Sequence, residues 1–264
     1  LADAHIICTS EEQAVEEIGK ALDLIEHMAG VFGLKMGEHY RFRLSLGDRT
    51  NTEKYYKNDA AWEMGEDLLR KHMQSRGVEF EEAKDEAAFY GPKIDVQMKN
   101  ANGKEDTAFT VQYDFCMPDH FDLTYIGEDG EKHHAFVVQR SSIGAIERIM
   151  ALLIEHYAGA FPTWLSPVQA RVLPIADAHK PYAEKVLAEL RAAGIRAEVD
   201  ESNETLGKKV REAKTQKIPY ILVVGDAEVA DETASLESRD KGKLGTLAIE
   251  TIVQRLKEEI SNRT

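Results

Sequence analysis

Cysteine and long apolar runs are both scarce in this chain, and each absence argues against a class of protein. The two cysteines, Cys8 and Cys116, lie far apart and form no paired motif, which argues against a disulfide framework and favours a reduced, cytoplasmic compartment. No apolar run approaches the roughly 20 residues that cross a bilayer, so no membrane partner is expected. No secretory leader is recognisable, and because the chain begins at Leu1 we expect an excised fragment or a processed chain.

Positive charge is also in deficit, with 33 Lys and Arg against 47 Asp and Glu and a net charge of −14. Such a balance argues against a broad nucleic-acid-binding surface. The deficit is uneven, because residues 1–165 carry 17 basic and 30 acidic side chains, whereas residues 166–264 carry 16 and 17. The C-terminal third could therefore present a local basic face. The absence of a glycine-rich phosphate loop disfavours a simple α/β nucleotide-binding module.

The periodicity of apolar residues predicts two domains, 1–165 and 166–264, that differ in their pattern of strands and helices. A rigid segment rich in aromatic residues and proline, 161–167, joins them. The first domain reads as α+β with an antiparallel sheet. Its predicted strands are 5–8, 40–46, 94–98, 107–115 and 134–138, and its predicted helices run from 9 or 10 to about 30–33, over 59–76 and from 143 to 159. The second domain alternates strand and helix, which predicts an α/β fold with a mostly parallel sheet.

Three segments of the first domain place polar or charged side chains in apolar surroundings. They are Glu86–Asp95, Thr110–Asp114 and Arg140–Arg148. A polar group placed in this way either hinders folding or has a ligand to meet. The arginine that ends the third segment begins an apolar helix, where a planar cation can stack on a base and reach a phosphate. The alternative interpretations are a solvated arginine, an ordinary Gly-Pro turn and the surface polarity of a half-exposed strand.

Together these segments resemble the second half of the catalytic domain of threonyl-tRNA synthetases, which are class II aminoacyl-tRNA synthetases. Residues 144–148 are similar to motif 3 of that class, in which the arginine stacks on adenine and contacts the γ-phosphate of ATP. The resemblance implies Arg148, Lys93 and Gln112 as catalytic residues. It further implies a substrate site of Asp3, Tyr90, Thr110 and Gln112, and an ATP site of Arg148, Glu147 and Gln112.

The resemblance also bears on zinc. In the family, an Asp-Ala-His sequence belongs to motif 2, its aspartate helps to read the threonine hydroxyl, and its histidine is one of three zinc ligands. Here Asp3 and His5 hold those places, but Gln139 stands where the family has its second zinc histidine, and glutamine is a poor zinc ligand. The third ligand belongs to a part of the fold upstream of Leu1. Zinc is therefore expected to be absent or weakly bound.

The second domain resembles the anticodon-binding domain shared by threonyl, prolyl, histidyl and glycyl synthetases. The resemblance implies tRNA contacts by Asn203, Glu204, Lys208, Arg211, Arg239 and Lys243, with Lys209, Lys214, Lys217 and Lys241 as further candidates for phosphate contact. A solvated helix face is the alternative for the basic residues between 208 and 217. Glu237 occupies a place where relatives usually carry an arginine, which predicts weaker tRNA binding or a contact with a base amino group.

The sequence thus predicts a threonine–tRNA ligase fragment that uses ATP and Mg²⁺ and acts on threonine and tRNA(Thr). A homodimer is expected of the full-length protein, but its main interface is expected upstream of Leu1, so the fragment could be monomeric. The alternative is a non-catalytic tRNA-binding or regulatory paralogue, which is favoured by Gln139, by Glu237 and by the missing upstream region.

Overall fold

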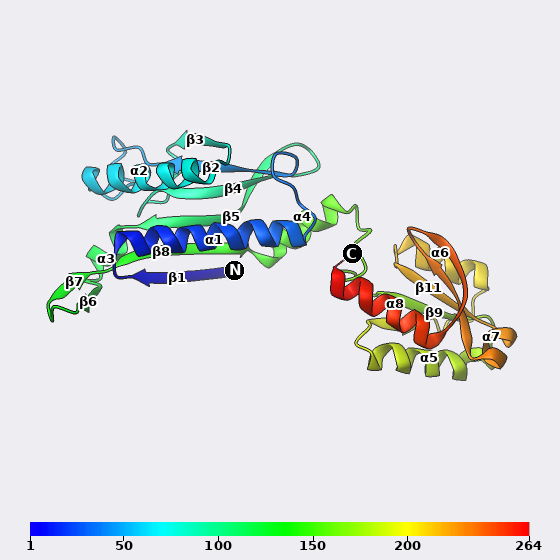
Figure 1. The fold of residues 1–264 in the computed structure, drawn as a ribbon. Coiled ribbons are helices and arrows are strands. Elements are labelled where there is room, and N and C mark those ends of the chain that lie inside the picture. The colour runs from blue at the N-terminus through cyan, green and yellow to red at the C-terminus, as the bar shows by residue number, and fades with distance from the viewer. Residues whose placement is uncertain (264) are drawn as a thin grey trace. The chain divides into compact units, whose positions relative to one another are not determined.

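The computed structural model describes residues 1–263. They form two compact units, 1–152 and 153–263. Each unit is built on its own sheet (Figure 1). Among the described residues, no helix combines the length and the apolar character needed to cross a membrane.

The N-terminal unit contains a six-stranded sheet in the order β1-β8-β5-β4-β2-β3. All neighbouring strands are antiparallel except β2 and β3, which are parallel. The strands are β1 (Ala2–Cys8), β2 (Tyr40–Leu46), β3 (Phe80–Lys84), β4 (Lys93–Lys99), β5 (Glu105–Asp114) and β8 (Phe136–Gly144). The α+β prediction is therefore confirmed, whereas β3 was not predicted because its residues are partly exposed and carry no alternating pattern.

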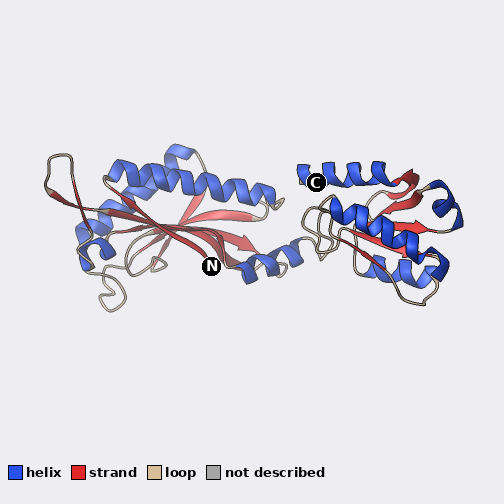
Figure 2. Cartoon of the chain, turned by 90° about the horizontal axis from the view of Figure 1, so that it is seen from below, coloured by secondary structure: helices blue, strands red, loops and turns tan. Residues whose placement is uncertain are grey.

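Two long helices, α1 (Glu11–Val31) and α2 (Asp59–Arg76), lie on one side of this sheet (Figure 2). Ser10 caps α1 by accepting a hydrogen bond from the backbone N–H of Gln13, while the Gln13 side chain accepts from the backbone N–H of Thr9. The two bonds form a capping box in which the return bond is shifted by one residue. The buried face of α1 then packs on the apolar side chains of β5 and β8, which leaves the other face of the sheet to polar residues.

Strand register decides which polar residues share that second face. Residues directly opposite one another on antiparallel strands point to the same side. One such row joins His5 to Gln139, Gln139 to Gln112, Gln112 to Lys93, and Lys93 to Ser45. A second row, two residues along each strand, joins Ser141, Thr110, Asp95 and Arg43. The apolar residues that alternate with them along the strands, such as Val138, Tyr113 and Val111, are buried on the helical side.

The junction of β8 and α4 (Ile146–His156) differs from the prediction, because β8 continues to Gly144 and delays the helix. Gly144 adopts a positive φ of 72°, and a Cβ there would lie 2.1 Å from the carbonyl oxygen of Ala108. Apolar residues recur along this helix at three- and four-residue spacing, but they do not all lie in the core. Ile149 and Leu153 are buried, whereas Ile146, Met150 and Ile154 are at least half exposed.

Smaller elements complete this unit, and none of them was predicted. They are α3 (Cys116–His120) and a separate hairpin of β6 (Thr124–Ile126) and β7 (Lys132–His134). These elements are three to five residues long, too short for a periodic pattern to identify them.

The C-terminal unit has a five-stranded sheet in the order β10-β9-β11-β12-β13. Its strands are β9 (Ala170–Pro174), β10 (Ala197–Val199), β11 (Tyr220–Val224), β12 (Thr233–Ser238) and β13 (Gly242–Ala248). The expectation of a mostly parallel sheet needs correction. Strands β10, β9 and β11 are parallel, but β12 and β13 are antiparallel to their neighbours. A short turn joins β12 to β13. Because a short turn reverses the direction of the chain, the two strands that it joins must be antiparallel.

The helices of this unit lie on both faces of its sheet. Residues of α5 (Lys180–Ala192) and α8 (Ile249–Asn262) form one apolar core with Val172, Leu222 and Leu236 of the sheet. Residues of α6 (Leu206–Thr215) pack on the opposite face against Leu173 and Ile221. A 3-10 helix, η1 (Asp177–His179), precedes α5, and the short α7 (Asp226–Asp231) joins β11 to β12.

Candidate functional site

The polar face of the N-terminal sheet brings together most of the predicted substrate residues. The Tyr90 hydroxyl donates a hydrogen bond to Oε1 of Gln112, and Lys93 lies directly opposite Gln112 on β4. Burial, with smaller contributions from nearby carboxylates, first among them Asp114, raises the pKa of Tyr90 to about 12. The phenol therefore stays protonated at neutral pH and acts as a hydrogen-bond donor.

A close approach of two backbones positions Tyr90 and Lys93. The backbone N–H of Tyr113 donates to the carbonyl of Pro92, and that of Phe115 donates to the carbonyl of Tyr90. Gly91 lies between them, and a Cβ at this position would lie only 1.9 Å from the carbonyl oxygen of Tyr113. A residue without a side chain is thus required here, and the Gly-Pro pair is more than an ordinary turn.

Asp95 organises the positive charge beside this pair. Its carboxylate is fully buried, and Oδ2 lies 2.9 Å from Nζ of Lys93, 3.0 Å from Nη2 of Arg43 and 2.8 Å from Oγ of Ser45. A buried carboxylate is tolerated only when it is paired and hydrogen-bonded. Asp95 therefore holds the Lys93 ammonium against the sheet.

Unpartnered polar atoms lie in the row next to these residues. Asp95 Oδ1, Thr110 Oγ1 and Ser141 Oγ are buried without a hydrogen-bond partner among the described residues, and their residues are neighbours on three adjacent strands. Buried polar atoms without partners are uncommon, and this group favours a site that meets a ligand or water. The sequence indicates Thr110 but not Ser141, since only register places the serine beside the threonine.

Arg148 and Glu147 lie on the first turn of α4 and are exposed. A guanidinium N–H of Arg148 donates to the carbonyl of Thr107 on β5. The arginine therefore reaches back to the strand that also carries Thr110 and Gln112, three and five residues further along. The site therefore has a planar cation at one end. Toward the other end it has Tyr90, Lys93 and Gln112, which we call the Tyr90 cluster.

The predicted zinc position contains an amide in place of a metal ligand. His5 lies opposite Gln139, whose Nε2 donates to Oδ2 of Asp114 over 2.5 Å. Within residues 1–263, no three His, Cys, Asp or Glu side chains lie close enough together to hold a metal ion. Zinc sites need three or four nitrogen, sulfur or carboxylate ligands, so the donors gathered here do not fit zinc. The expectation of absent or weak zinc binding stays a prediction.

Asp114 is a central, buried member of this group. Its Oδ1 accepts hydrogen bonds from the backbone N–H groups of Cys116 and Met117, at 3.0 and 2.9 Å. Burial raises the pKa of Asp114, although these donors and Gln139 oppose the shift. The sequence pattern does not indicate Asp114 as a substrate residue, because its role depends on a partner on another strand, Gln139.

The predicted tRNA-binding residues gather around α6, and several already have partners. Lys208 forms an ion pair with Glu204 at 2.6 Å, Lys180 donates to the amide oxygen of Asn203, and Arg211 is exposed. Lys209 is not part of this face, contrary to the prediction. It is buried, and its ammonium group donates hydrogen bonds to the carbonyls of Pro174 and Asp200, which lie at the end of β9 and just after β10.

The second predicted basic patch is also partly occupied. Arg239 donates to the carbonyls of Phe161 and Lys217 and pairs with Asp240 at 2.8 Å, whereas Lys243 is exposed on β13. Glu237 forms an ion pair with Lys214 of α6 at 2.6 Å. The acidic residue in this surface thus neutralises a candidate phosphate contact.

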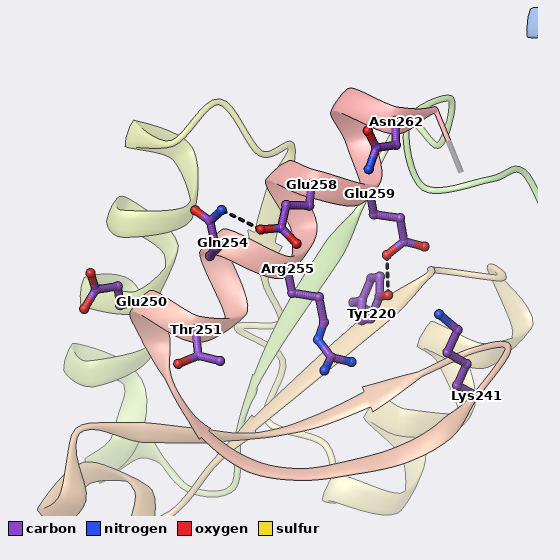
Figure 3. A pocket seen from close by; sticks show the side chains of 9 residues that line it. All are labelled: Tyr220, Lys241, Glu250, Thr251, Gln254, Arg255, Glu258, Glu259 and Asn262. Carbon is purple, nitrogen blue, oxygen red and sulfur yellow. Dashed lines mark hydrogen bonds between the residues drawn. The ribbon is translucent and has the colours of Figure 1, made fainter.

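An open pocket of about 1100 Å³ lies elsewhere, between α8 and the turn that joins β12 to β13 (Figure 3). It is lined by Tyr220, Lys241, Glu250, Thr251, Gln254, Arg255, Glu258, Glu259 and Asn262. Three glutamates against two basic residues make it a poor site for phosphate. It includes none of the predicted substrate residues and, of the predicted tRNA contacts, only Lys241.

Comparison with protein families identifies both units. Residues 1–157 match the tRNA synthetase class II core domain (G, H, P, S and T), and residues 169–259 match the anticodon-binding domain. The chain belongs to the class II aminoacyl-tRNA synthetase family. The predicted domain boundary between residues 165 and 166 stays a prediction, and the two compact units of the structure divide between Leu152 and Leu153.

Particular relatives are threonine–tRNA ligases. The chain is 46% identical over 263 residues to threonine–tRNA ligase of Clostridium perfringens and 47% identical over 262 residues to that of Listeria monocytogenes. It covers 40% of the length of each of these two proteins. A crystal structure described as the RNA binding domain of threonyl-tRNA synthetase from Cryptosporidium parvum superimposes with a TM-score of 0.87 at 30% identity, covering 97% of this chain and 63% of that one. The chain thus spans about two fifths of the length of its curated relatives.

Proposed function

We propose that this chain carries the amino-acid side of the active site and the anticodon-binding domain of a threonine–tRNA ligase. The observation that carries the proposal is the polar face of the N-terminal sheet, on which Tyr90, Lys93 and Gln112 converge. The similarity to threonine–tRNA ligases over the whole chain supports it. Through the family resemblance, the proposal includes action in the cytoplasm as a homodimer of the complete protein.

In this proposal, the threonine carboxylate attacks the α-phosphorus of ATP, and the bond to pyrophosphate breaks. The 3′-terminal ribose hydroxyl of tRNA(Thr) then attacks the acyl carbon, and AMP leaves. Asp3, Tyr90, Thr110 and Gln112 bind and orient threonine, while Arg148, Glu147 and Gln112 hold the nucleotide. Mg²⁺, when bound to the triphosphate, would neutralise part of its charge.

Lys93 has a defined role in this scheme. Its ammonium, held by Asp95, lies opposite Gln112 and can stabilise negative charge where the carboxylate and phosphate meet. No side chain becomes covalently attached to substrate, so positioning and electrostatics supply the rate enhancement.

The test is threonine-dependent exchange of pyrophosphate into ATP, measured on the complete natural protein that contains these residues. Exchange with threonine, and its loss on Lys93→Ala, is the expected result. Binding of tRNA(Thr) without any exchange would instead support the non-catalytic tRNA-binding paralogue.

Glu237→Gln is expected to strengthen tRNA(Thr) binding by about 3- to 10-fold at low salt. The carboxylate now pairs with Lys214, and its removal frees one cation to neutralise a phosphate. The slope of log K against log salt should steepen by about 0.7, the value for one phosphate contact on a single strand.

Glu232→Gln is the matched control, because it breaks another 2.6 Å Glu–Lys pair, with Lys185, outside the predicted tRNA-binding residues. Filter binding across a salt series distinguishes the two variants. Equal affinities for both would show that Lys214 does not contact tRNA.

A further inference from the structure

Two glutamines on neighbouring strands have amide groups whose orientation is decided by their partners. Gln139 lies on β8 directly opposite Gln112 on β5. Directly opposed residues in an antiparallel pair have Cβ atoms about 5 Å apart, so both amides can reach one ligand group. Gln139 is more than nine-tenths buried, and Gln112 is half-buried.

Asp114 orients the first amide. Its Oδ1 already accepts two backbone N–H groups, and its Oδ2 accepts from Nε2 of Gln139. A carboxylate can only accept hydrogen bonds, so the NH₂ end of the Gln139 amide must face it. The carbonyl oxygen of Gln139 is therefore directed away from Asp114.

Tyr90 orients the second amide in the opposite sense. Its hydroxyl donates to Oε1 of Gln112, so the NH₂ end of Gln112 is left for a ligand. The two glutamines together present one acceptor and one donor. A hydroxyl group can satisfy both at once, whereas an ammonium group can only donate and a methyl group can do neither.

We propose that the Gln139 carbonyl and the Gln112 amide nitrogen form a metal-free reader of the side-chain hydroxyl of a β-hydroxy amino acid, with Asp114 as the positioning residue. The inference rests on the proposed function and specifies how its substrate is selected. It also accounts for the amide group of Gln139 at the position where zinc does not fit. Shape alone separates threonine poorly from the nearly isosteric valine, whereas a pair of buried hydrogen bonds rejects valine strongly.

Asp114→Asn provides the sharpest test. The asparagine oxygen can keep both backbone hydrogen bonds, so its NH₂ group turns toward Gln139 and the Gln139 amide must reverse. Two donors then face the substrate hydroxyl, which loses its acceptor. Asp67→Asn on α2 removes the same charge on the helical side of the sheet and serves as the control.

The measurement is calorimetric titration of the complete natural protein with threonyl- and valyl-adenylate analogues, with and without a zinc chelator. We expect at least about 100-fold preference for the threonyl analogue, unchanged by the chelator. The preference should fall at least about tenfold in Asp114→Asn, the loss expected for one hydrogen bond to a buried group, and should persist in Asp67→Asn. Gln139→Met, which removes the acceptor without replacing Asp114, should reproduce the loss if Asp114→Asn fails to fold.

The other outcomes separate this inference from the function on which it rests. Loss of threonyl binding on chelation would overturn the metal-free reader and leave the ligase proposal standing. Undiminished preference in both Asp114→Asn and Gln139→Met would do the same. Absence of threonyl-analogue binding in the unmodified protein would overturn both.

Discussion

Arg148→Ala is expected to lower the rate of threonine-dependent ATP–pyrophosphate exchange by about 10²–10³-fold, the usual effect of removing one preorganised charge donor. The guanidinium lies on the first turn of α4 and is tied to the carbonyl of Thr107. It is thus held beside β5 at the end of the strand remote from Asp114. A planar cation in that place can stack on the adenine and stabilise the triphosphate of the proposed reaction.

Kinetic constants separate this role from a structural one. The KM for ATP should rise while the KM for threonine changes little, because the arginine lies away from the Tyr90 cluster. Arg148→Lys should recover only a small part of the rate, since it keeps the charge and loses the planar fork. Arg255→Ala on α8 is the control for removing a helical arginine outside the candidate site. Unchanged exchange in Arg148→Ala would exclude Arg148 from the nucleotide site.

Gly91→Ala is expected to destabilise the β4–β5 region by about 3 kcal/mol, at the upper end of the usual cost of overpacking. The added Cβ would lie 1.9 Å from the carbonyl oxygen of Tyr113, which is backbone and cannot rotate away. The strands must separate, which moves Tyr90 and Lys93 apart from Gln112. The rate of threonine-dependent ATP–pyrophosphate exchange should therefore fall together with the stability of the β4–β5 region.

Hydrogen exchange of the β4 and β5 amides is the appropriate measurement, because a protein of two units does not have a single well-defined unfolding free energy. Gly30→Ala is the matched control. It lies inside α1, and a Cβ added there would meet no atom within 4 Å, so the alanine should be neutral or stabilise by up to about 1 kcal/mol. Normal protection of β5 in Gly91→Ala would show that the close approach is not required.

Local patterns in the sequence were sufficient for the elements that lie in long periodic segments. Ser10 marks the start of α1 by its side-chain chemistry, and Asn102 with Gly103 is typical of the tight turn that joins β4 to β5. These signals act over three or four residues, so they can be recognised without knowledge of the rest of the fold. The same holds for the three polar segments, which stand out from apolar neighbours.

Contacts between distant segments could not be obtained in this way. Nothing near Lys209 in the sequence shows that its ammonium reaches the carbonyls of Pro174 and Asp200. The stripe of α4 is continuous in the sequence, yet only Ile149 and Leu153 are buried. The antiparallel pairing of β12 and β13 likewise follows from a turn and a register that the alternation of strand and helix does not specify.

The sequence by itself determined the two-unit organisation, the main helices and strands, and the residue types that the candidate site contains. Only the tertiary structure decided which of those residues face one another. Register places Gln139 between His5 and Gln112, Asp114 reverses one amide relative to the other, and Ser141 joins Thr110. The physical reason is that side-chain chemistry and periodicity are local properties, whereas the orientation of a hydrogen-bonding group depends on partners that are distant along the chain.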